Sequence, residues 1–195
     1  MVTCFPLLPI ASLDVCVSHH PEGANPKLGI GGAAYSPIQL HIFLDANNSY
    51  VATAIKQELP AVLAHEMHHC ARMQTNTDEE TLAGKLVIEG LACKFETEIT
   101  GERLPSFISP ALMDQCGSHW QAAQELLDSK EFCMQSWFHG EAPNQMPNYL
   151  GYALGLSLTE KYLSLVEKTA AQANEVPTNE VISVLLNAET GSANW

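Results

Sequence analysis

The chain has 195 residues, of which 46% are hydrophobic and 16% are charged. This composition is typical of one globular domain, and no stretch approaches the roughly 20 uninterrupted apolar residues of a membrane helix. Nine Lys and Arg against 22 Asp and Glu give a net charge of −13. Such a charge would repel a phosphate backbone, so we expect neither nucleic acid nor a membrane as a partner.

The cysteines and the N-terminal run bear on the compartment of the protein. The six cysteines lie far apart and form no CxxC pair, which favours reduced thiols in the core over a disulfide framework. The apolar run MVTCFPLLPIASL has no Lys or Arg and contains Pro6 and Pro9, unlike an export signal. We therefore expect a cytoplasmic protein with a single domain over residues 1–195.

The first predicted elements are strands within residues 14–45. The segments DVCVS, LGIGGAAY and PIQLHIFLD partly alternate β-branched or aromatic residues with polar ones, which predicts two or three strands. Gly31 and Gly32 in the second segment indicate a bulge or a place where another backbone approaches closely. Residues 1–48 are thus expected to be mainly β.

The chain downstream of these strands has a helical pattern. One helix contains LPAVLAHEMHHCARM, with Pro60 in its first turn, where an amide hydrogen would be unpaired anyway. A second helix is expected over 78–99, because Thr77 and Glu80 form a capping-box pattern and Gly101 offers an end. Further helices are expected over 120–129, 131–138, 149–168 and 179–186.

The first of these helices carries an HExxH motif, HEMHH. Helical spacing places the imidazoles of His65 and His69 one turn apart on one face, where both can bind the same metal ion. Glu66 follows the first histidine, and from there its carboxylate can reach a metal-bound water instead of the metal. The motif therefore predicts two metal ligands and a base.

A catalytic zinc needs a third protein ligand, and Glu89 is the candidate. It follows His69 by 20 residues. It also belongs to a stripe with helical spacing that should face inward. A carboxylate on an apolar stripe is costly unless it is paired or bound to a metal. The other members of the stripe are Leu82, Leu86, Cys93 and Glu96.

The segment VIEGLACKFE resembles the glutamate-ligand segment of the gluzincin peptidases, the thermolysin and zinc-aminopeptidase group. Glu89 matches their ligand, and Glu96 matches a second acidic residue of the aminopeptidases. A closer resemblance, over most of the chain, is to a bacterial family of predicted zinc-dependent proteases that is classed as a domain of unknown function. Three segments carry it in that family's order: GIGGAAYSPIQLHIFLD, AHEMHH with VIEGLACKFE, and NYLGYALGLSLTEKYL.

The resemblance implies a minimal gluzincin-like α+β fold, with a small N-terminal sheet packed on a mostly helical body over residues 49–195. It also implies Zn²⁺ held by His65, His69 and Glu89, and a peptide or protein substrate. Such a site leaves a position open for water, whose pKa zinc lowers towards about 7. Glu66 would then act as the general base and pass the proton to the leaving amine.

An oxyanion formed during hydrolysis needs a second stabilising group besides the metal. Tyr152 is the first candidate, because Gly151 and Gly155 beside it would let its helix pack closely against the metal helices. His139, before a glycine in a probable loop, is the second candidate. Each has a structural alternative, a core tyrosine and a surface histidine.

Glu96, His68 and the strand with residues 31–35 are further candidates for roles around the metal site. Glu96 would either orient a ligand histidine through its ring N–H or form an exposed salt bridge. His68 would lie behind the metal or on the substrate side. The strand with residues 31–35 resembles the edge strand that lines the gluzincin cleft, where glycines would permit a substrate backbone to approach.

Two other hypotheses fit the sequence. One is a zinc-binding regulatory or scaffold protein without proteolytic activity, because a short chain leaves little room for the second lobe of a gluzincin cleft. The other is an acidic helical interaction module in which HExxH is a coincidence. The sequence predicts neither the substrate, nor endo- or exopeptidase action, nor the oligomeric state.

Overall fold

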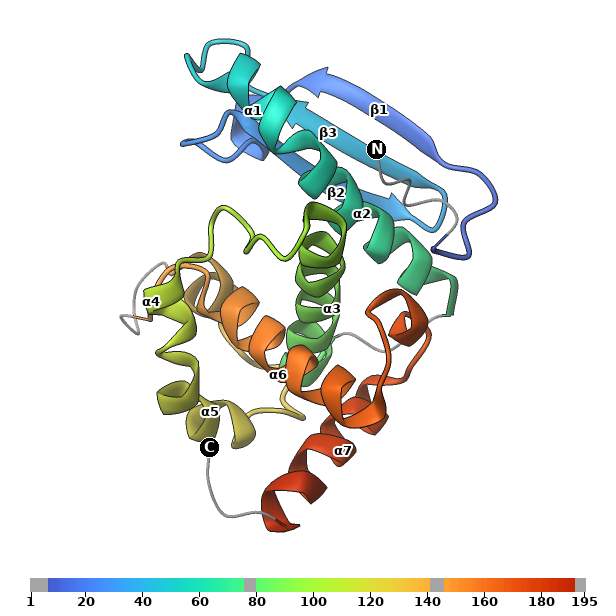
Figure 1. Cartoon of the computed structure of the whole chain (residues 1–195). Coiled ribbons are helices and arrows are strands. Elements are labelled where there is room, and N and C mark those ends of the chain that lie inside the picture. The colour runs from blue at the N-terminus through green and yellow to red at the C-terminus, as the bar shows by residue number, and fades with distance from the viewer. Residues whose placement is uncertain (1–6, 76–79, 141–145, 192–195) are drawn as a thin grey trace. The chain divides into compact units, whose positions relative to one another are not determined.

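The computed structural model describes residues 7–75, 80–140 and 146–191 (Figure 1). It contains a small three-stranded sheet in its N-terminal part and is mostly helical after it. The α+β class predicted from the sequence is therefore confirmed. The chain forms two compact units, the first of residues 1–76 and 95–103 and the second of residues 77–94 and 104–195. The expected single domain stays a prediction.

The first unit contains the sheet, built from β1 (Asp14–His19), β2 (Ile30–Ser36) and β3 (Gln39–Leu44). The strand order is β1-β3-β2, with β1 parallel and β2 antiparallel to the central β3. All three predicted strand segments are thus strands. Because β2 lies at one side of the sheet, the prediction that the glycine-rich segment forms an edge strand is also confirmed.

Helices α1 (Val51–Gln57) and α2 (Leu59–Arg72) follow the sheet. Figure 1 shows α2 running along one face of the sheet, and it packs against β2 and β3. Pro60 lies in the first turn of α2 as predicted. Residues that alternate along β3, Leu40 and Ile42, are fully or almost fully buried, and their burial fixes which face of the sheet the helix covers.

Helix α3 (Leu82–Thr100) is continuous, with its first part in the second unit and its last part in the first. It begins at Leu82 and not at residue 78, so the predicted start was wrong; Thr77 itself lies outside the described residues. Thr81 is the capping residue, since its Oγ accepts a hydrogen bond from the Gly84 amide at 3.1 Å. The predicted end is correct, because Gly101 follows with a left-handed φ of 76°.

The start of α3 also explains why the helix expected over 120–129 ends earlier, at Gln124. The amides of Leu82 and Ala83 donate to the carbonyl oxygens of Ser129 and Leu127, at 3.0 and 2.9 Å. These carbonyls therefore satisfy the free amides of α3 and do not continue a helix of their own. Helix α5 accordingly spans Cys116–Gln124.

The remaining helices of the second unit are α4 (Pro110–Met113), α6 (Leu150–Val166) and α7 (Thr178–Gly191). The helix expected over 131–138 is a single π-helical turn, Gln135–His139, which ends at a left-handed Gly140. Helix α6 packs against α4, α5, α7 and this turn. It is therefore the centre of the second unit.

Two glycines bring the backbones of α3 and α6 into contact. A Cβ on Gly90 would collide with the carbonyl group of Gly155, and a Cβ on Gly155 would collide with the carbonyl oxygen of Leu86. The prediction that Gly155 allows close packing on a helix expected to carry a metal ligand is confirmed. Gly151 instead packs against the ring of Phe138, so that part of the prediction was wrong.

The cysteines of the described residues divide into two groups, and Cys4 lies outside these residues. Cys70, Cys93 and Cys116 are buried, as predicted, whereas Cys16 and Cys133 are exposed. Burial raises the pKa of Cys116 to about 11, so this thiol stays protonated at neutral pH. Within the described ranges, no helix is long and apolar enough to cross a membrane.

Candidate metal centre

Helix α2 carries the three residues of HExxH that the sequence predicts as site residues, all within the first unit. His65, Glu66 and His69 are each less than 9% exposed. The rings of His65 and His69 meet edge to face, with centroids 4.7 Å apart. The structure therefore has the two imidazoles on one helical face, one turn apart, as the spacing predicts.

Glu96 lies beside the first of these histidines. Its Oε2 is 3.4 Å from Nδ1 of His65, and Glu96 is only 4% exposed. A carboxylate at Nδ1 holds the ring proton on that nitrogen and leaves Nε2 available as a ligand atom. Of the two predicted roles, orientation of a histidine and an exposed salt bridge, the buried contact agrees with the first.

Glu89 stands on the same helix as Glu96, two turns earlier, and therefore on the same face of α3. Its side chain is half-buried, while Leu86 and Cys93 of the predicted stripe are fully buried. His65, His69 and Glu89 each offer one ligand atom, and these atoms all lie within 4.8 Å of one another. Two imidazole nitrogens and a carboxylate oxygen are a donor set that catalytic zinc takes, so the residues present fit this metal.

Glu66 packs against strand β2 at Gly32. A Cβ built on Gly32 would lie 2.6 Å from Cγ and 2.9 Å from Oε1 of Glu66. The sequence left a bulge and a close approach open for the two glycines. The sheet has its register irregularity between Ala34 and Ser36, so a bulge at the glycines was wrong. The close approach of another backbone is confirmed at Gly31, where a Cβ would collide with the carbonyl oxygen of Gly23, whereas the neighbour of Gly32 is a side chain.

Cys70 follows the second histidine and is a protonated thiol. Burial, and then the negative charge of Glu66, raise its pKa to about 11. Its Sγ donates to the carbonyl oxygen of Gln39 on β3, at 3.7 Å. This contact helps to tie α2 to the sheet.

His68 is fully buried, and its ring packs on that of Phe95, with centroids 5.7 Å apart. Both residues belong to the first unit, one on α2 and one on the last part of α3. A ring without exposed surface does not present itself to a substrate. His68 therefore belongs to the packing behind the motif, and the substrate-side alternative was wrong.

The two candidates for an oxyanion group lie in the second unit. Tyr152 on α6 is half-buried and belongs to an aromatic cluster, with its ring centroid 5.2 Å from that of Phe107 and 5.3 Å from that of Phe138. His139 is exposed at the end of the π-helical turn. Their roles stay predictions.

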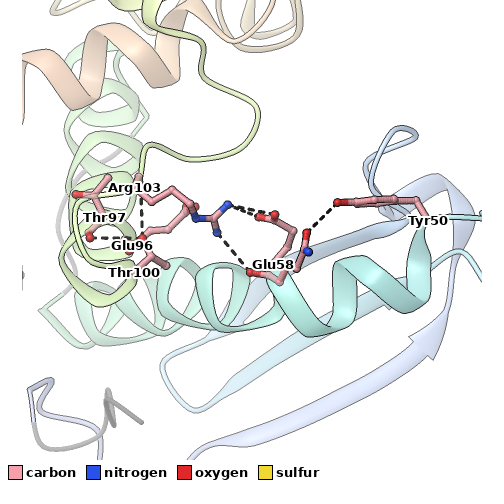
Figure 2. Close-up of polar contacts among 7 residues, drawn as sticks. Tyr50, Glu58, Glu96, Thr97, Thr100 and Arg103 are labelled. Atoms are coloured by element: carbon pink, nitrogen blue, oxygen red, sulfur yellow. Dashed lines mark hydrogen bonds and ion pairs between the residues drawn. The ribbon is translucent and has the colours of Figure 1, made fainter.

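A group of polar contacts that the sequence reasoning missed ties the end of α3 to the start of α2 (Figure 2). Arg103 Nη1 donates to both carboxylate oxygens of Glu58, at 3.1 and 3.0 Å. Its Nη2 donates to the carbonyl oxygen of Gln57, at 3.5 Å. In the last turn of α3, the hydroxyl of Thr100 donates to the carbonyl oxygen of Glu96. Arg103 is one of only nine Lys and Arg in the chain. In so acidic a chain, each of these cations is a candidate partner for a carboxylate, and this was the signal in the sequence that could have indicated the contact.

The comparison with protein families identifies the class to which this fold and group of residues belong. Residues 15–183 match the family described as predicted Zn-dependent protease (DUF2268). The match covers most of the chain, so the chain belongs to this family, as the resemblance of its motifs predicts. Neither a curated protein nor a solved structure matched the chain.

Proposed function

We propose that this chain is a zinc peptidase of the gluzincin type, in which His65, His69 and Glu89 hold Zn²⁺. The observation that carries the proposal is the group of three ligand atoms within 4.8 Å of one another. Membership in a family of predicted zinc-dependent proteases supports the same metal and a peptide or protein substrate. The match over residues 15–183 also supports a single functional domain, and we retain the cytoplasmic location as part of the proposal.

His65, His69 and Glu89 would hold the zinc, which when bound would supply a water of lowered pKa and polarise a substrate carbonyl. Glu66 acts as the general base, because it directly follows the first ligand, His65, and its side chain is buried beside β2. It takes the proton of the attacking water and passes it to the leaving amine. Glu96 keeps His65 in the orientation that presents Nε2.

We assign the oxyanion role to Tyr152, whose hydroxyl would donate to the developing negative charge. The aromatic rings around Tyr152 restrict its side chain, which supports a fixed donor. Tyr152→Phe should lower kcat roughly 10- to 1,000-fold and leave the metal bound. The same assay on His139→Ala tests the second candidate.

The metal is tested by plasma mass spectrometry of the purified protein. We expect about one zinc per chain in the wild type. We expect it to be lost in His69→Ala and in Glu89→Ala. Glu125→Gln and His119→Ala are the controls, because they change the same residue types outside the predicted ligand set. A wild-type protein without zinc after incubation with the metal would overturn the site.

The variant Glu66→Gln distinguishes the hypothesis of an enzyme from that of a zinc-binding scaffold. This change keeps the size of the side chain and removes the base, so peptide hydrolysis should fall by roughly 100- to 10,000-fold. Bound zinc should stay at the wild-type level. A wild-type protein that binds zinc but cleaves no member of a peptide library would favour the scaffold.

A further inference from the structure

The edge strand β2 faces helix α2 through a residue without a side chain. Gly32 pairs with Ile42 of β3 in the sheet register, and Ile42 is buried on the face that α2 covers. Paired residues of neighbouring strands point to the same face. Gly32 therefore stands where a side chain of β2 would project towards α2.

The glycine at this position is not explained by backbone conformation. Among the described glycines, a left-handed φ is found at Gly29, Gly101 and Gly140, and not at Gly32. An alanine could therefore adopt the backbone of Gly32 without strain. The explanation must lie in the space that a side chain would fill.

That space is taken by Glu66. A Cβ on Gly32 would lie 2.6 Å from Glu66 Cγ, 2.9 Å from Glu66 Oε1 and 2.9 Å from Cγ1 of Val62, one turn earlier on α2. Glu66 is only 7% exposed, so it has little room to adopt another rotamer. The neighbouring Gly31 differs, because a Cβ there would collide with the backbone carbonyl of Gly23.

We propose that Gly32 is a positioning residue for the catalytic base: the missing side chain forms the seat in which Glu66 lies against β2. The inference rests on the proposed function. Its contact geometry, by contrast, involves only the first unit and does not depend on the metal. An added methyl group would push the carboxylate away from the strand and leave the ligands His65 and His69 in place.

The geometric part is tested by thermal unfolding of a double-mutant cycle. Gly32→Ala should lower Tm by roughly 3–10 °C, because it overpacks the contact with Glu66. In a Glu66→Ala background Cγ and Oε1 of Glu66 are gone and only Cγ1 of Val62 stays close, so the same change should lower Tm by clearly less. Equal losses of Tm in both backgrounds would overturn the seat. Should Gly32→Ala alone fail to fold, folding of the double variant supports the seat, and failure of both variants overturns it.

The catalytic part is tested by steady-state kinetics and metal analysis of the zinc-loaded protein. We expect Gly32→Ala to lower kcat roughly 100-fold, since a displacement of about 1 Å can cost that much. KM and the zinc content should be nearly unchanged. Gly117→Ala is the matched control, because a Cβ there meets nothing within 4 Å, and it should leave kcat unchanged. An unchanged kcat in Gly32→Ala, or a loss of zinc equal to the loss of activity, would contradict the proposal.

The experiments distinguish the function of the chain from the positioning role of Gly32. If the wild type binds no zinc or Glu66→Gln stays active, the proposed function fails, while the cycle in Tm still reports whether Glu66 occupies the seat. If zinc binding and the requirement for Glu66 are established and Gly32→Ala has wild-type kcat, only the positioning role fails.

Discussion

Among the contacts that depend on glycine, one in each compact unit can be compared by what lies opposite the glycine. In the second unit, Gly90 and Gly155 bring the backbones of α3 and α6 together. In the first unit, Gly32 of β2 faces the side chain of Glu66. A backbone cannot move aside without moving its whole helix, whereas a side chain can be displaced locally while its helix stays in place. The first contact therefore maintains the fold, and in our proposal the second sets the place of the catalytic base.

The difference predicts that alanine affects kcat directly at only one of the two contacts. Substitution in the second unit should appear mainly in the free energy of unfolding. Substitution at Gly32 should lower kcat as well as Tm. If both contacts affected only stability, the distinction between a structural and a positioning glycine would be lost.

The largest effect is expected for Gly155→Ala. The added Cβ would collide with the carbonyl oxygen of Leu86 and also approach the amide nitrogen of Gly90 to 3.1 Å, so α3 and α6 must separate. We expect a loss of about 3 kcal/mol or more in the free energy of unfolding, measured by urea denaturation. In Gly117→Ala, whose Cβ meets nothing within 4 Å, stability should change by less than about 1 kcal/mol. Equal stability of the two variants would show that the helices tolerate a wider crossing.

A smaller effect is expected for Glu96→Gln, which sharpens the comparison within the first unit. The amide keeps the size of the carboxylate but loses the charge beside His65 Nδ1. The affinity for zinc should fall roughly tenfold, measured by competition with a chelator, because such partners orient the ligand histidine. Glu125→Gln is the control and should keep the wild-type affinity. An unchanged affinity in Glu96→Gln would mean that the carboxylate only fills space.

The structural features that could be predicted from the sequence are those that depend on residues close together along the chain. HExxH places His65 and His69 on one face of any helix, and the alternation in PIQLHIFLD predicts a strand wherever it packs. Glu89 and Glu96, seven residues apart, share a face of one helix for the same reason. The local sequence therefore predicts which of these residues share a helical face, and their roles in a metal site stay a prediction.

The features that the sequence did not predict depend on residues distant along the chain. The start of α3 is set by carbonyls of Leu127 and Ser129, more than 40 residues downstream. A helix-capping pattern at Thr77 could not reveal that the first amides of α3 have distant partners. For Gly32, both a bulge and a close approach were consistent with the sequence. Only the position of Glu66 across from it decides between them.

The smallest effects are expected for two salt bridges that differ in burial. Glu58 is 6% exposed and accepts two hydrogen bonds from Arg103, whereas the partners in Lys130–Glu80 are both largely exposed. Arg103→Met leaves a buried carboxylate without its cation, but the side chain of Arg103 is itself 41% exposed, so water can compensate in part.

We therefore expect Arg103→Met to cost about 1–2 kcal/mol in the free energy of unfolding. Lys130→Met should cost less than about 0.5 kcal/mol. Added salt should screen the exposed pair more than the buried one, so urea denaturation at low and high ionic strength distinguishes the contributions of the two pairs to stability.

Because Arg103 ties the end of α3 to the start of α2, its loss should also weaken zinc binding, whereas Lys130→Met should not. Equal zinc affinities in the two variants would show that the metal ligands are held without this link.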